Sequence, residues 1–197
     1  MILKKVNQEN EQEIIVRPLA KLKRGEGAKI MAQGNFFKIW QWPQKLYDGS
    51  EVTFESVSRA DTVTVLALTA DKKVIMTKQT QPGFQEFLSL PGGIIDEGEG
   101  VLTACKRELL EETGFSSDDW YFLFSGQMNS RIDWANFYLV AKNCQKVAEL
   151  KPDAGEKISV ELFDLNQLVQ LVKEKNFRNS DFALWYFQTD GEELKNL

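Results

Sequence analysis

The sequence predicts an α+β fold with a small antiparallel β element at its N-terminus. Three observations support this prediction. The chain has 197 residues, 43% of them hydrophobic, which suits one compact domain with a small appended element. Stretches typical of strands and of helices follow one another without a regular βαβ repeat, which argues against a doubly wound nucleotide-binding fold. The first third of the chain shows stretches typical of strands.

The N-terminal β element is expected within residues 1–58, and the main domain within residues 59–197. Runs of β-branched and aromatic residues, bounded by turn-forming residues, indicate its strands. These strands are expected at residues 13–17, 36–42 and 51–57, with a turn at 47–50.

The main domain opens with two apolar runs, at residues 62–69 and 73–78. Because only three residues separate them, they predict a hairpin of two core strands. Later segments with similar patterns follow. We expect strands at 120–125, 134–141 and 157–163, and helices at 165–174 and 180–188.

A helix is predicted at residues 101–113, where the hydrophobic period changes. Leu102, Cys105 and Leu109 stand at i, i+3 and i+7 and therefore share one face. Gly114 follows at the position where a left-handed residue ends a helix.

The composition excludes several classes of function. The net charge is −5, whereas non-specific nucleic-acid binding requires clustered Lys and Arg. No stretch is long and apolar enough to span a bilayer, and the N-terminus lacks the apolar core of a secretory signal. We therefore expect a soluble, cytoplasmic protein with a small-molecule partner, and neither a nucleic-acid nor a membrane partner.

The chain contains no histidine, which excludes Ser-His-Asp and Cys-His nucleophiles and His-ligated zinc. Cys105 and Cys144 are too few and too far apart for a disulfide framework or a thiolate metal site. Acid–base and metal chemistry must therefore fall to carboxylates.

Three glutamates lie together on the predicted helix. Glu108, Glu111 and Glu112 stand at i, i+3 and i+4, so they share one face, where like charges repel. A bound cation would compensate for this repulsion, and oxygen ligands favour Mg²⁺ or Mn²⁺ over zinc. The alternative is an ordinary solvated acidic face.

The sequence around this cluster decides between the two interpretations. Residues 93–115 match the pattern G-x5-E-x7-R-E-U-x-E-E-x-G-U, where U is a bulky apolar residue, at every specified position. A chance match in a chain of this length has a probability below about one in a million. The pattern is that of the Nudix hydrolases, and the chain resembles this family. The resemblance implies an α/β/α sandwich and hydrolysis of a pyrophosphate bond.

The resemblance also implies a set of metal ligands. Glu108 and Glu112 are expected to bind the metal directly, Glu111 directly or through water, and the backbone carbonyl of Gly92 to complete the set. The family implies two or three Mg²⁺ ions, with Mn²⁺ as an alternative. Such ions polarise the pyrophosphate and generate hydroxide from bound water.

Other residues of the motif have structural roles in the family. The resemblance implies that Arg107 and Glu99 form a pair that ties the loop to the helix. Gly93 lets the backbone pass close to the metal site, where a side chain would interfere. We include Arg107 with Glu111 and Glu112 among the catalytic candidates.

Outside the motif, residues 54–63 resemble the ADP-ribose pyrophosphatase and nucleotide-sugar branch of the family. In that branch the N-terminal element often forms a homodimer and contributes to the partner's site. Trp40 and Trp42 are candidates for stacking on a nucleobase, and the alternative is that they form one packed face of a strand.

Further candidates come from the same resemblance. Arg59 is a candidate phosphate ligand, because a guanidinium binds phosphate oxygens in a forked geometry, and the alternative is a surface salt bridge. Gln81 stands where the branch usually has an arginine, and Arg131 is a candidate contact for the distal half of the substrate. Glu156 lies where the branch places a loop glutamate that acts as general base or binds a metal, and the alternative is an ordinary loop carboxylate.

These features predict a Mg²⁺-dependent pyrophosphatase that converts ADP-ribose or a nucleotide sugar into a nucleoside monophosphate and a sugar phosphate. The first alternative is a house-cleaning nucleoside triphosphate pyrophosphatase. The second is a catalytically silent module that senses a nucleotide. Gln81, Ser89 and Gly92 differ from the residues that are usual at these positions in the ADP-ribose pyrophosphatase branch. The sequence therefore does not specify the base or the sugar of the substrate.

Overall fold

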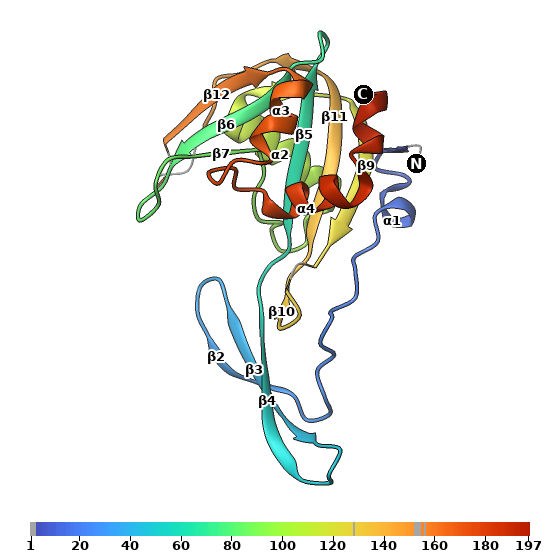
Figure 1. Cartoon of the computed structure of the whole chain (residues 1–197), viewed down its shortest axis with the longest axis vertical. Helices are drawn as coiled ribbons and strands as arrows, with labels where there is room; N and C mark the ends of the chain where they lie inside the picture. The colour runs from blue at the N-terminus through green and yellow to red at the C-terminus, as the bar shows by residue number, and fades with distance from the viewer. Residues whose placement is uncertain (1–2, 128, 152–154, 156) are drawn as a thin grey trace.

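The computed structural model describes residues 3–127, 129–151, 155 and 157–197. Figure 1 shows two unequal parts, a large sheet flanked by helices and a small sheet that extends away from it. The chain passes between them where strand β4 (Glu51–Ser58) leads into strand β5 (Thr62–Thr69).

The large sheet has its main strands in the order β1, β9, β11, β5, β6, β12, with β7 paired to β6 and β8 paired to β11. The bounds of these strands are β1 (Lys4–Val6), β6 (Val74–Thr80), β7 (Phe87–Ser89), β8 (Phe115–Ser116), β9 (Asp119–Gly126), β11 (Asn136–Lys146) and β12 (Lys157–Phe163). Strands β5 and β11 run parallel, and the other neighbouring pairs run antiparallel. This mixed sheet is consistent with the absence of a βαβ repeat from the sequence.

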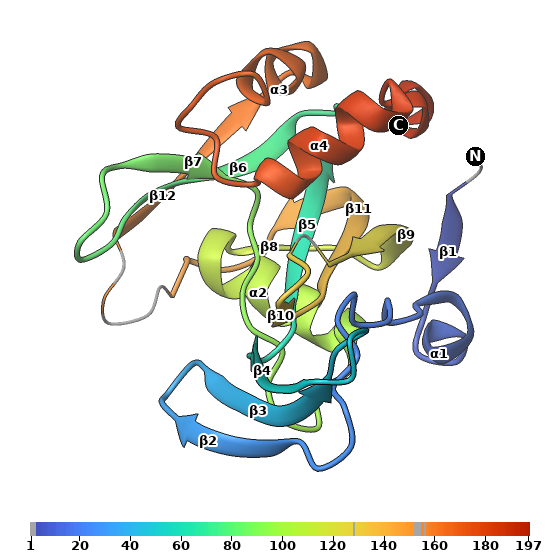
Figure 2. The same cartoon turned by 60° about the horizontal axis from the view of Figure 1, so that its bottom comes forward.

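Helices cover both faces of the large sheet (Figure 2). They are α2 (Val101–Thr113) on one face and α3 (Leu165–Leu171), α4 (Ser180–Thr189) and the 3-10 helix η1 (Glu192–Asn196) on the other. Alternate residues of β5 face the two layers: Val65 packs in the same buried cluster as Leu109 of α2, and Leu66 in the same cluster as Phe182 of α4. The arrangement confirms the predicted α/β/α sandwich.

The small sheet has the strand order β10, β4, β3, β2. Its further members are β2 (Lys29–Gln33), β3 (Lys38–Lys45) and β10 (Ile132–Asp133). Trp42 of β3 is 2% exposed and packs edge-on against Phe54. By contrast, all five residues of β2 are exposed. The buried apolar contacts of the small sheet are therefore centred on Trp42 and Phe54, in β3 and β4.

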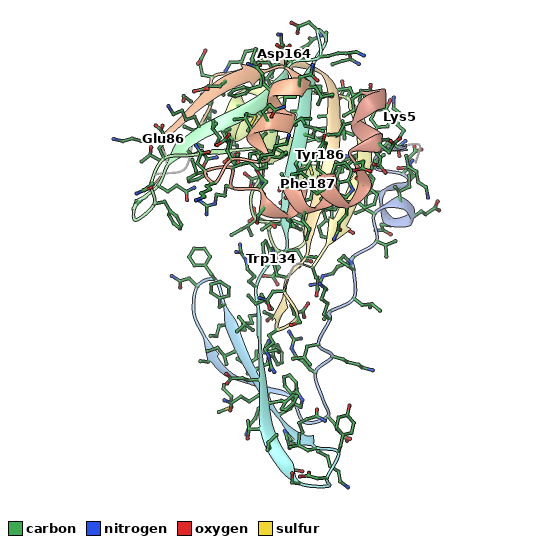
Figure 3. All side chains as sticks on the ribbon, viewed as in Figure 1. Lys5, Glu86, Trp134, Asp164, Tyr186 and Phe187 are labelled. Atoms are coloured by element: carbon green, nitrogen blue, oxygen red, sulfur yellow. The ribbon has the colours of Figure 1, made fainter. Side chains whose placement is uncertain are left out.

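An ion-pair network joins the N-terminal segment to both sheets. Arg17 donates to Asp61, just before β5, at 2.6 Å and to Asp133 of β10 at 2.8 Å, while Arg24 donates to Asp133 at 2.8 Å. Trp134, the residue after Asp133, lies where the two parts of the molecule meet (Figure 3). The network therefore holds the small sheet next to the end of the large sheet at which β5 and β11 begin.

The structure corrects the sequence prediction in the N-terminal segment. The strand expected at residues 13–17 is absent, and the short helix α1 (Glu11–Ile14) lies there instead. Strand β1, which pairs with β9 of the large sheet, was not expected, and neither was β2. Elsewhere β5 and α2 match the predicted residues 62–69 and 101–113 at both ends. Within the described residues, no helix is long and apolar enough to cross a membrane.

Candidate active site

Glu112 is the most enclosed of the three clustered glutamates. Its side chain is on the last turn of α2, and the residue is 6% exposed. One carboxylate oxygen accepts from Gln79 Nε2 at 2.9 Å, and the other accepts from the Gly92 N–H at 2.9 Å. The carboxylate is therefore held between strand β6 and the loop before the helix.

Arg107 connects the loop to the helix. Its Nε and Nη2 donate to the two oxygens of Glu99, at 3.0 and 2.9 Å, and Nη2 also donates to the Ile94 carbonyl at 2.8 Å. Its Nη1 donates to Glu108 at 2.8 Å and to Glu111 at 3.2 Å. The hydrogen bonds from Arg107 lower the pKa of Glu99 from its usual range. Arg107 thus orients two of the clustered glutamates and contacts the loop that faces them.

Three glycines in this region allow close backbone approaches. A Cβ at Gly92 would collide with the Val63 carbonyl, and a Cβ at Gly93 would collide with the Glu108 carboxylate. Gly114 has φ 70°, ends α2 in the left-handed conformation and donates to the Leu110 carbonyl. The first two glycines therefore keep the loop against β5 and the acidic face of α2.

The loop and helix border a cleft of about 710 Å³. One flank is formed by the start of β5, the start of β11 and the tip of the β2–β3 hairpin, and the other by β6 and β7. The start of α4 joins the two, since Asp181 accepts from Asn136 of β11 and Asn179 accepts from the Leu90 N–H. Gly92, Gly93 and Glu112 lie between the two flanks, since residues 91 and 93 bond to β5 while Glu112 bonds to β6. This volume is typical of small-molecule sites.

The donors at the bottom of the cleft suit a hard divalent cation. They are carboxylates and a backbone carbonyl, all oxygen, and the missing side chain of Gly93 leaves room beside Glu108. Among the described residues, however, no three acidic or cysteine side chains converge as a ready cluster. Arg107 bonds to Glu108 and Glu111, and Gln79 bonds to Glu112, so the carboxylates are held by protein donors. The residues fit the chemistry of Mg²⁺ or Mn²⁺.

A chain of polar side chains supports Glu112 from strand β6. Gln81 Nε2 donates to Gln79 Oε1 at 3.2 Å, and Gln79 Nε2 lies 2.9 Å from Thr77 Oγ1 as well as bonding to Glu112. Thr77 and Ser89 share a hydrogen bond at 2.9 Å. Gln79 was not predicted from the sequence, because a buried glutamine on an apolar strand gives no signal until the strand is placed beside α2.

Arg59 lines the cleft on the β5 and β11 flank. Its Cζ lies 5.1 Å from the Trp134 ring centroid and 5.8 Å from that of Phe37. Burial lowers the pKa of its guanidinium, and its Nε is buried without a hydrogen-bond partner in the described part of the chain. An arginine remains charged under these conditions and retains donors for a ligand.

Two other predicted site residues do not line the cleft. Trp42 is buried in the small sheet, where its indole N–H donates to Gln44 at 3.2 Å. Arg131 is exposed beside the small sheet, with its Cζ 5.7 Å from the Phe54 ring. Glu156 lies outside the described residues.

An α/β/α sandwich in which a glycine-containing loop packs against the acidic face of a helix beside a cleft defines the class of protein. The model of the NUDIX domain matches residues 58–186, which is more than half of the chain. The chain therefore belongs to the Nudix family of hydrolases.

The comparisons also identify individual relatives. The chain is 26% identical over 168 residues to the methanol dehydrogenase activator of Bacillus methanolicus, covering 83% of this chain and 90% of that one. It is 22% identical over 154 residues to the ADP compounds hydrolase NudE of Escherichia coli (strain K12), covering 77% and 83% of the two chains. It is 35% identical to the ADP-ribose pyrophosphatase of Bacillus subtilis (strain 168), over 85 residues that cover 43% and 46%.

A solved structure supports the fold. A crystal structure of an ADP compounds hydrolase superposes with a TM-score of 0.68 at 21% identity, covering 85% of this chain and 95% of the other.

Proposed function

We propose that this chain is a Mg²⁺- or Mn²⁺-dependent pyrophosphatase that hydrolyses the diphosphate of ADP-ribose or a nucleotide sugar. The products are a nucleoside monophosphate and a sugar phosphate. The observation that carries the proposal is the position of Glu112, held by Gln79 and Gly92 at the bottom of a cleft that also contains Arg59. The relatives named for ADP compounds and ADP-ribose support the same substrate class.

In this proposal the helix glutamates and the Gly92 carbonyl hold two or three metal ions. When bound, these ions supply Lewis-acid polarisation of the diphosphate and lower the pKa of the attacking water. The chain's own residues position the reaction: Arg107 orients Glu108 and Glu111, and Gln79 orients Glu112. Preorganised ligands of this kind reduce the reorganisation that accompanies the reaction.

The substrate is proposed to lie across the cleft with its diphosphate between the two flanks. Arg59 would donate to phosphate oxygens, since its guanidinium is partly desolvated and its Nε lacks a partner in the described residues. Gln81 borders the same cleft beside Gln79. We retain Glu156 as the candidate general base and Arg131 as a candidate contact for the distal half of the substrate. Trp42 is 2% exposed, so its ring has no free face for a nucleobase and it is not retained as a substrate contact.

We also propose that the N-terminal element, residues 1–58, forms a homodimer interface. The small sheet exposes large apolar side chains on both of its faces, since the strand register places Ile39 and Val52 on opposite faces. They are Ile30 (43% exposed), Met31 (51%), Phe36 (63%), Phe37 (45%), Ile39 (39%) and Val52 (39%). Sedimentation should give twice the mass of one chain, and a monomer at micromolar concentration would contradict the proposal.

A panel of compounds tests the substrate class. With Mg²⁺ or Mn²⁺ we expect ADP-ribose or a nucleotide sugar to release a nucleoside monophosphate, and dinucleoside polyphosphates and nucleoside triphosphates to react more slowly. Turnover of triphosphates alone would identify a house-cleaning pyrophosphatase instead. Nucleotide binding without turnover, with either metal, would identify a sensor.

A second candidate function is regulation of a partner enzyme. It is favoured by the relative named as a methanol dehydrogenase activator, since 90% of that chain is matched. Adding the protein to a purified alcohol dehydrogenase should then raise its turnover. The Glu112→Gln variant would show whether such activation requires hydrolysis.

A further inference from the structure

A second arginine borders the cleft on the flank opposite Arg59. Arg178 directly precedes Asn179 at the start of α4, and its Cζ lies 4.3 Å from the Phe87 ring centroid and 4.7 Å from that of Phe84. Both Arg59 and Arg178 therefore lie against pairs of aromatic rings, one on each flank of the same cleft. Stacking occupies the faces of a guanidinium and leaves its N–H edge available.

The backbone around Arg178 is fixed, although its side chain is exposed. The Arg178 N–H donates to the Leu88 carbonyl of β7 at 3.0 Å, and the next residue, Asn179, accepts from the Leu90 N–H through its side chain at 2.8 Å. These bonds attach the segment to the strand that leads into Pro91 and Gly92. The fold thus sets the position of the Arg178 backbone relative to the bottom of the cleft, and the guanidinium lies against Phe84 and Phe87.

The acidic residues close to Arg178 already have other partners. Glu86, next to Phe87, pairs with Lys78 at 2.8 Å and points away from the body of the molecule (Figure 3). Asp181, on the first turn of α4, accepts from Asn136 at 2.9 Å and from the Tyr138 hydroxyl. No ion pair of Arg178 is formed within the described residues, so its charge is available to a ligand in the cleft.

We propose that Arg178 binds an oxyanion on the group that the diphosphate links to the nucleoside. This inference rests on the proposed function and, within its substrate class, predicts tighter binding of compounds that carry a phosphate or carboxylate beyond the diphosphate. The diphosphate is assigned to Glu112 and Gly92, Arg59 contacts Trp134 and Arg178 contacts Phe87 of β7. Arg59 would then bind the diphosphate and Arg178 the additional anion, each through a forked N–H edge.

Two matched pairs of ligands test this proposal. UDP-glucose and UDP-glucuronate differ by a carboxylate, and ADP-ribose and ADP-ribose phosphorylated on its terminal ribose differ by a phosphate. Dissociation constants are measured by calorimetry in EDTA, so that binding is separated from turnover. For at least one pair we expect the anionic member to bind the wild type about tenfold more tightly, as one charge-assisted contact provides.

Variants assign that preference to one side chain. Arg178→Gln should reduce the preference to less than about twofold, whereas Lys173→Gln, which removes an exposed charge from the same segment outside the cleft, should retain it. Arg178→Lys should retain part of it, which separates loss of charge from loss of packing. Thermal unfolding checks that each variant folds.

The outcomes separate the inference from the function on which it rests. Equal affinities within both pairs in the wild type, or a preference unchanged in Arg178→Gln, would overturn the role of Arg178 even if the enzyme hydrolyses diphosphates. Absence of monophosphate release from all four compounds with Mg²⁺ or Mn²⁺ would overturn the proposed function.

Discussion

Gln79 Nε2 donates to Glu112 Oε1 at 2.9 Å and so connects strand β6 to the acidic helix inside the cleft. Gln79 is 4% exposed and Glu112 is 6% exposed, so the bond is shielded from water. The bond orients a carboxylate that the proposed function assigns to metal binding. A partner of this kind typically changes metal affinity or activity by about 10- to 100-fold when it is removed.

Replacing Gln79 by Met should weaken Mn²⁺ binding and lower kcat, each by about tenfold or more, while KM changes little. The side chains are similar in size, and the substitution removes the donor to Glu112, the bonds to Thr77 and Ser89, and the acceptor for Gln81. Mn²⁺ titration followed by electron paramagnetic resonance measures the affinity without turnover. Gln145→Met, on the exposed end of β11, is the control. Wild-type Mn²⁺ affinity in Gln79→Met would show that the bond has no positioning role.

Glu11 should stabilise helix α2 from outside it. Its Oε1 accepts from the Leu102 N–H at 2.9 Å, and Gly100, the N-cap residue of α2, makes no side-chain cap. Glu11→Ala should lower the free energy of unfolding by about 1 kcal/mol, the usual loss for an N-terminal cap. Urea unfolding measures the difference. Glu13→Ala, on an exposed position of the same turn, should cause a much smaller change, and equal losses in the two variants would contradict the capping role.

The Glu99 and Arg107 pair predicts a pH dependence. Because hydrogen bonds from Arg107 lower the pKa of Glu99 in the folded state, the pair adds stability above the unfolded value of about 4.3. This stability is lost as the pH falls through the folded pKa. Urea unfolding of wild type and Glu99→Gln should therefore show a difference at pH 7 that shrinks below about pH 4.

The matched control for this pair is Glu97→Gln, an exposed carboxylate in the same loop. Its stability relative to wild type should vary little over the same pH range. A difference between wild type and Glu99→Gln that persists undiminished in acid would mean that the pair contributes through packing instead of charge.

The acidic helix could be predicted from sequence because its signals are local. Leu102, Cys105 and Leu109 are all buried, and Gly114 has the left-handed conformation that ends the helix. The apolar run of β5 is equally local, and both elements match their predicted residues. The Nudix motif predicted the family for the same reason, since its residues are close together in the chain.

The features that could not be predicted depend on tertiary contacts. Residues 13–17 have an apolar run typical of a strand, but Glu11 caps α2 and α1 forms beside it. Strand β2 has no buried face and is defined by its pairing with β3. Gln79 and Arg178 are 99 residues apart in the sequence. Their place in one candidate site could not be predicted, because it depends on the fold bringing β6 and the start of α4 to the same cleft.

Glu112→Gln should abolish most of the activity while the fold persists. The substitution keeps the size of the side chain but removes the charge expected to bind the metal, so kcat should fall by at least about a hundredfold, more than for a supporting residue. Glu97→Gln should retain wild-type turnover, and circular dichroism should show all three proteins folded.

The central claim is hydrolysis of a diphosphate at this carboxylate, and phosphorus NMR of the reaction with ADP-ribose and nucleotide sugars tests it most directly. With Mg²⁺ or Mn²⁺ and the wild type, the diphosphate resonances should be replaced by those of two phosphate monoesters, and Glu112→Gln should leave the diphosphate intact. Unchanged diphosphate with the wild type, or equal conversion by Glu112→Gln, would contradict the account.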